Sequence, residues 1–178
     1  MKGDFNLEKL EIFFHLLYKI VKYLVVTIAV ALTITVLLQV FTRYVIFYSL
    51  PWTEELARYL LVWLTMLGGA VAYRQRAHIG VSFFVNLLPE KGIKFVRLIS
   101  SLLVMLFSIY VIRFGIEFVF STARQLSPAM RISMSYVSSS IPVGLTLLII
   151  FGVENFLKSL GLLEIELEKT TLTETELD

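Results

Sequence analysis

The feature that most constrains this chain is a run of twenty residues without a charge, 23–42, between Lys22 and Arg43. A helix of that length spans about 30 Å, which matches the hydrocarbon core of a bilayer. Composition agrees, because the 178 residues are 57% hydrophobic and 17% charged. Soluble domains are roughly 45–50% apolar and about 25% charged. The sequence therefore predicts an integral membrane protein.

Three more apolar stretches predict three further spans, at residues 52–73, 98–123 and 132–153. The third span contains Arg113 and Glu117, four residues apart, where they can neutralise each other. Pro142 cannot donate a hydrogen bond to the carbonyl of Ser138, so we expect a kink in the fourth span. The serine-rich first half of that span should face protein rather than lipid. We predict an all-α membrane protein with one four-helix domain, residues 1–160.

Three segments outside the spans have their own predicted roles. Residues 5–22 form an amphipathic pattern, which predicts a helix in the headgroup region or one packed on a partner. Residues 79–89 are uncharged but too short to span, so they predict a short interfacial segment between the second and third helices. Residues 161–178 form an acidic tail that we expect to be cytoplasmic and mobile.

The distribution of basic residues predicts the orientation. Eleven of the 16 lysine and arginine residues precede the first span, lie between the second and third, or follow the fourth. By the positive-inside rule, both termini should be cytoplasmic. Arg74 and His78 lie near that interface at i,i+4 spacing, where they could contact a lipid phosphate or an acidic group of a partner. Simple positive-inside anchoring is an equal alternative for Arg74.

The second span begins with Pro51 and a group of charges. Glu54 and Glu55 are adjacent, so on a helix they point about 100° apart and do not naturally share a proton or a metal ion. Unpaired charge beside an apolar span is expensive. We therefore predict that both carboxylates pair with Arg58 and Arg43 in one cluster at the outer end of the first two helices.

Further along the second span, Gly68 and Gly69 begin a patch of small residues that also contains Ala70 and Ala72. Such patches let a neighbouring backbone approach closely. Trp52 suits an anchor at the membrane surface. The sequence therefore predicts a packing face on this helix.

Nothing in the sequence predicts an enzyme. There is no cysteine, which excludes disulfides and thiolate sites, and there is no phosphate-binding glycine loop, H-E-x-x-H or G-x-S-x-G motif. His15 and His78 lie near the predicted interface, not inside the bundle where haem ligands would be. We expect no catalytic residue, no metal site, no bound cofactor and no nucleic-acid partner.

Residues around the second span resemble one family of membrane proteins. They are Arg43-Tyr44, the run Trp52-Thr53-Glu54-Glu55-Leu56-Ala57-Arg58, then Trp63, Gly68-Gly69-Ala70, Arg74 and His78. Together they resemble the small membrane subunit of tripartite ATP-independent periplasmic (TRAP) transporters. The motif part covers residues 43–89, about a quarter of the chain.

The resemblance implies a small scaffold subunit beside a large membrane subunit that moves substrate by a sodium-driven elevator motion. The substrate implied is an organic acid such as a dicarboxylate, sialic acid or a similar carboxylate. It also implies transient contact with a periplasmic substrate-binding protein, contact with phospholipid, and sodium ions held by the large subunit and not by this chain. The implied location is the inner membrane of a bacterium or archaeon, as a multi-pass protein.

The resemblance also implies which residues form the structural or partner interface: Arg43, Trp52, Glu54, Glu55, Arg58, Trp63, Gly68 and Gly69. Two other functions remain open at this point: a free-standing four-helix transporter or channel, and a membrane anchor subunit of a redox enzyme. Uptake by liposomes that hold this chain alone would favour the first alternative. Absorbance at haem wavelengths would favour the second.

Overall fold

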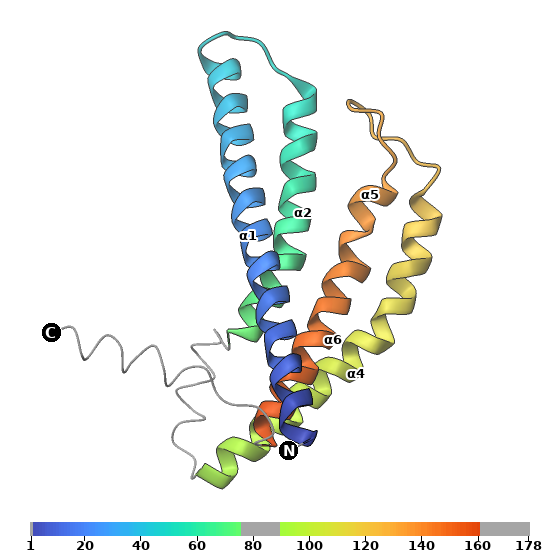
Figure 1. Cartoon of the computed structure of the whole chain (residues 1–178). Coiled ribbons are helices and arrows are strands. Elements are labelled where there is room, and N and C mark those ends of the chain that lie inside the picture. The colour runs from blue at the N-terminus through green and yellow to red at the C-terminus, as the bar shows by residue number, and fades with distance from the viewer. Residues whose placement is uncertain (1, 76–89, 161–178) are drawn as a thin grey trace, which may run out of the picture.

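The computed structural model describes residues 2–75 and 90–160 (Figure 1). Its helices are α1 (Lys2–Tyr44), α2 (Pro51–Arg74), α4 (Glu90–Thr122), α5 (Ser135–Ser138) and α6 (Ser140–Ser159). Four stretches are long and apolar enough to cross a membrane: Lys9–Tyr44, Pro51–Arg74, Phe95–Thr122 and Ser135–Ser159. The prediction of an all-α fold with four spans is confirmed. The predicted interfacial segment 79–89, the tail 161–178 and His78 lie outside the described residues.

The helices follow one another across the molecule in the order α1, α2, α6, α4, because the extensive contacts join α1 to α2, α2 to α6 and α6 to α4. Figure 1 shows the α1–α2 pair and the α6–α4 pair separating toward the end with the two connections, 45–50 and 123–134. We call this the hairpin end. The opposite end, where Arg74 of α2 meets Glu154 of α6, is the ion-pair end. This arrangement leaves many apolar side chains exposed for lipid or protein to cover.

α1 corrects the prediction of a separate amphipathic helix at 5–22. The helix runs without a break from Lys2 to Tyr44, and no glycine or proline lies between residues 4 and 44 to interrupt it. Its 43 residues extend about 65 Å, roughly twice the thickness of the hydrocarbon core. The amphipathic stretch continues the axis of the first span, and its residues Phe14 and Val21 are buried against the chain.

The fourth span begins at Ser135, three residues later than predicted. Residues 132–134 instead belong to the connection from α4. There the N–H of Ser127 donates to the carbonyl of Ile132 at 2.9 Å, and the N–H of Met134 donates to the carbonyl of Gln125 at 2.9 Å. These bonds hold the 123–134 connection in a folded loop.

Near the predicted kink of the fourth span, the structure shows a local irregularity in the helix. The regular helix is interrupted at Ser139, between α5 and α6 and three residues before Pro142. The polar first half of the span faces protein, as predicted. Ser138 and Ser140 are buried, and the hydroxyls of Thr122 and Ser138 lie 3.0 Å apart.

The core lies where α1, α2 and α6 meet, around Val21, Leu67, Ala70, Val71, Leu147 and Phe151. Two glycines of α6 permit close helix contacts on either side. A Cβ placed on Gly144 would lie 2.9 Å from the Cβ of Met66 on α2, and one on Gly152 would lie 2.6 Å from the Cγ of Met105 on α4. On α4, buried small residues recur every seven positions: Ser101, Ser108, Gly115 and Thr122. This repeat gives α4 a narrow face against α6.

Candidate functional site

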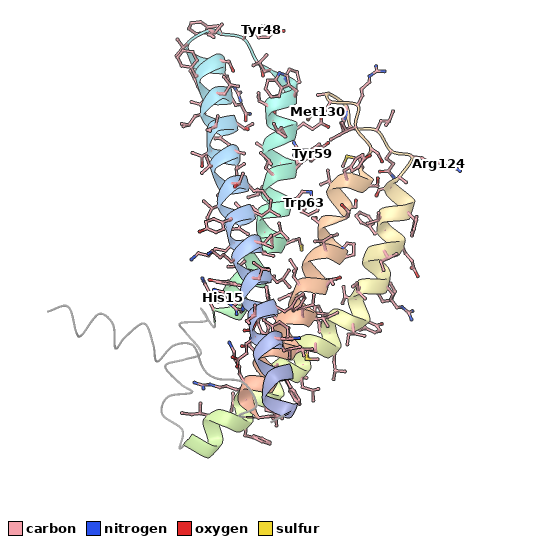
Figure 2. The ribbon with its side chains drawn as sticks, in the orientation of Figure 1. His15, Tyr48, Tyr59, Trp63, Arg124 and Met130 are labelled. Atoms are coloured by element: carbon pink, nitrogen blue, oxygen red, sulfur yellow. The ribbon has the colours of Figure 1, made fainter. Side chains whose placement is uncertain are left out.

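A buried carboxylate on α2, Glu55, organises the hairpin end. Its side chain is 8% exposed. One oxygen accepts a hydrogen bond from the hydroxyl of Tyr59, one turn further along α2. The other accepts from the backbone N–H groups of Ala129 and Met130, at 3.0 and 2.8 Å. Figure 2 shows Tyr59 on α2 and Met130 on the facing loop. Glu55 therefore fixes the 123–134 loop against α2 with neutral donors.

The predicted cluster of four charges does not form, and this part of the prediction is wrong. Arg58 contacts Glu54 at 3.4 Å, but both side chains are more than 60% exposed. Glu55 binds the loop amides instead of an arginine. Arg43 is exposed and has no ion pair with any carboxylate in the part of the chain that the structure describes. Pairing with an arginine is unnecessary for Glu55, because three donors already satisfy its charge.

The two tryptophans of α2 have different surroundings. The indole N–H of Trp63 donates to the backbone carbonyl of Tyr136 at 3.2 Å, which links α2 to α5 (Figure 2). Trp63 also packs against the core. Trp52 is 40% exposed at the start of α2. Trp63 thus stabilises the chain internally, whereas Trp52 stays available to lipid or a partner.

At the ion-pair end, Glu154 of α6 is the centre of a second buried network. It is 2% exposed and receives two hydrogen bonds from Arg74 of α2, at 2.6 and 2.7 Å. The ammonium of Lys158 lies 2.8 Å from the same carboxylate. The guanidinium of Arg74 also lies 4.2 Å from the centre of the Tyr18 ring on α1. One side-chain network therefore joins α1, α2 and α6.

This geometry differs from the headgroup or partner contact predicted for Arg74. Its side chain is only 8% exposed, and the planar guanidinium meets the carboxylate of Glu154 in the two-bond geometry that arginine favours. His78, the other residue of that prediction, lies outside the described residues. The sequence showed Glu154 only as the charge that ends the fourth span, because its partner is 80 residues away.

In the predicted patch of small residues, Gly68 and Gly69 face open space within this chain, whereas Ala70 is buried in the core. A Cβ placed on either glycine would meet nothing within 4 Å. The close helix contacts fall instead on Gly144 and Gly152 of α6. The seven-residue repeat of small residues on α4 was the sequence signal for this tight side of the bundle.

The described residues contain no group of three or more His, Cys, Asp or Glu side chains that could hold a metal ion. Among the described residues, the buried carboxylates are fully engaged: Glu55 with Tyr59 and two loop amides, and Glu154 with two cations. The arrangement is suited to holding helices at fixed positions, and these networks offer no unengaged acid or base for catalysis.

Comparison with known proteins then decides the family. Residues 32–161 match the family model of the DctQ component of tripartite ATP-independent periplasmic transporters. The chain belongs to this family. It is a multi-pass membrane protein and a small transporter subunit, not an enzyme, and the resemblance seen in the sequence is confirmed.

The chain is similar in sequence to two sialic acid TRAP transporter proteins. The chain is 33% identical over 125 residues to the sialic acid TRAP transporter permease protein SiaT of Haemophilus influenzae, covering 70% of this chain and 20% of SiaT. It is 29% identical over 126 residues to the sialic acid TRAP transporter small permease protein SiaQ of Vibrio cholerae, covering 70% of this chain and 72% of SiaQ. The chain thus spans about a fifth of SiaT but most of SiaQ.

Proposed function

We propose that this chain is the static scaffold subunit of a sodium-driven TRAP transporter that takes up a carboxylate such as sialic acid. The observation that carries the proposal is that both ends of α2 are fixed to the rest of the chain through buried carboxylates, Glu55 and Glu154. Such internal bonding suits a support and not a moving carrier. The substrate class follows from the names of the relatives SiaT and SiaQ, which are sialic acid transporter proteins.

The partner in this proposal is a separate large membrane subunit that performs the elevator motion and holds the sodium ions. SiaT supports it, because a region like this chain accounts for only 20% of that one polypeptide. In this proposal, the remaining four-fifths of SiaT corresponds to the large subunit, which is a separate chain beside this one. A periplasmic substrate-binding protein docks transiently at the hairpin end, where Glu55 holds the 123–134 loop in place.

The proposed orientation places both termini in the cytoplasm and the hairpin end in the periplasm, in line with the bias of basic residues. Reporter fusions at Leu50 and Ser127 should then give a periplasmic signal, and a fusion at Thr173 a cytoplasmic one. A periplasmic signal at Thr173 would reverse this assignment.

Reconstitution tests the function. Liposomes that contain this chain and the large subunit, supplied with binding protein, sialic acid and an inward sodium gradient, should accumulate sialic acid. Liposomes that lack this chain should accumulate much less, and those with this chain alone none. Uptake by this chain alone, or full uptake in its absence, would contradict the scaffold role.

A further inference from the structure

Two charged side chains of α4, Arg113 and Glu117, point away from the rest of the chain. Gly115 lies between them and packs on α6, where a Cβ at this position would be 3.1 Å from Ile141. Two residues of helix correspond to about 200° of rotation, so both charges project from the face opposite Gly115. Both are exposed.

The positions of these two charges along the length of the bundle follow from the contacts that α4 makes with α5 and α6. Near the ion-pair end, Met105 lies against Gly152, two residues before Glu154. Near the hairpin end, the hydroxyl of Thr122 contacts that of Ser138. Arg113 is eight residues from Met105 and nine from Thr122, or about 12–14 Å from each. Glu117 lies about one turn nearer the hairpin end, five residues before Thr122, so both charges lie within the span Phe95–Thr122, in its half toward the hairpin end.

Neither charge is neutralised within the described residues. Arg113 and Glu117 were expected to pair with each other, but they form no ion pair with each other or with another described side chain. The guanidinium of Arg113 lies 4.8 Å from the centre of the Phe114 ring, which offers a cation–π contact and no opposite charge. Ionisable groups inside a span normally face protein or water rather than hydrocarbon.

We propose that this outer face of α4 is the surface that packs against a transmembrane segment of the large subunit. The complementary segment carries a carboxylate opposite Arg113 and a cationic or hydroxyl donor opposite Glu117. This inference rests on the proposed function, which supplies a partner inside the membrane. The 20% coverage of SiaT favours a different protein over a second copy, because that polypeptide contains much additional chain beside the region like this one.

The test is recovery of the large subunit with tagged full-length chain from membranes that co-express both. The variants Arg113→Gln and Glu117→Gln remove one charge each, which makes insertion easier and not harder. Each should reach wild-type levels in the membrane yet recover roughly tenfold less large subunit, because the partner charge is left unpaired. The control Arg124→Gln removes an exposed charge beyond the end of α4, and recovery should change by less than about twofold.

Other outcomes show whether lipid, a second copy of this chain or the large subunit covers this face of α4. Undiminished recovery with both single variants means that lipid covers this face, which overturns the inference and leaves the proposed function standing. Equal losses with Arg124→Gln would show a general charge effect and would also overturn it. Cross-linked pairs of this chain that the single variants lose and the double variant restores would assign the face to a second copy. Absence of large subunit with the wild-type chain would overturn the proposed function itself.

Discussion

The two ends of α2 are held by different chemistry. At the hairpin end, Glu55 accepts hydrogen bonds from neutral donors, two of them backbone amides of a loop. At the ion-pair end, Glu154 is bonded to two cations, Arg74 and Lys158, with Arg74 almost as buried as itself. The first arrangement positions a loop, and the second holds helices together. Removing Glu55 would free a loop, whereas removing Glu154 would take the buried carboxylate away from two cations.

The largest expected effect comes from Glu154→Ala. Breaking a buried ion pair by removing one partner costs about 3–5 kcal/mol, because the other charge stays buried. The free energy of unfolding in mixed micelles measures this loss. The double variant Arg74→Met with Glu154→Met leaves neither charge of the pair alone and should lose less. An equal or greater loss in the double variant would show that stranded charge is not the cause.

The next largest effect on the free energy of unfolding should come from the packing of α6 against α2, between the hairpin end and the ion-pair end. Gly144→Leu forces bulk against Met66, and overpacking of this kind costs about 1–3 kcal/mol. The matched control is Gly69→Leu on α2, where nothing lies within 4 Å of the added group. Unfolding of the isolated chain should therefore change with Gly144→Leu and not with Gly69→Leu. Equal destabilisation by both would mean that the open side of α2 is packed after all.

At the hairpin end, Glu55→Ala should act locally. The amides of Ala129 and Met130 lose their acceptor, so their hydrogen exchange should speed up, while amides around Glu154 keep their protection. Removing an arginine as well should restore nothing, because no arginine among the described residues pairs with Glu55. Unchanged exchange at both loop amides would show that Glu55 does not hold the loop.

These contrasts also show where sequence reasoning ends. Apolar runs and their bounding charges were sufficient for four spans, and Pro142 marked the region where the regular helix is interrupted, since both signals are local. The partners of Glu55 lie 74 and 75 residues away and are backbone amides, which every residue possesses. No side-chain pattern could have named them. The predicted arginine pairing of Glu55 failed because it considered only charged side chains as partners.

The smallest effect is expected from the exposed pair at the hairpin end. Glu54→Ala and Arg58→Ala should each change the free energy of unfolding by about 0–1 kcal/mol, because both side chains are well solvated. The free energy of unfolding of each variant is compared with that of Glu154→Ala under the same conditions. A loss of stability from Glu54→Ala as large as that from Glu154→Ala would contradict this expectation. It would mean that the solvent exposure of an ion pair does not predict its contribution to stability.

The central claim is that this chain is a static support fixed at both ends. A direct test is the distance between spin labels at Thr33 on α1 and Ile109 on α4, the two outer helices of the layer, in the complete transporter. The chain has no native cysteine, so each introduced label is unique within it. Adding sodium and sialic acid should change this distance by less than about 2 Å, within the range of small helix adjustments. A larger shift that follows substrate would show that this chain moves during transport, and the scaffold account would be wrong.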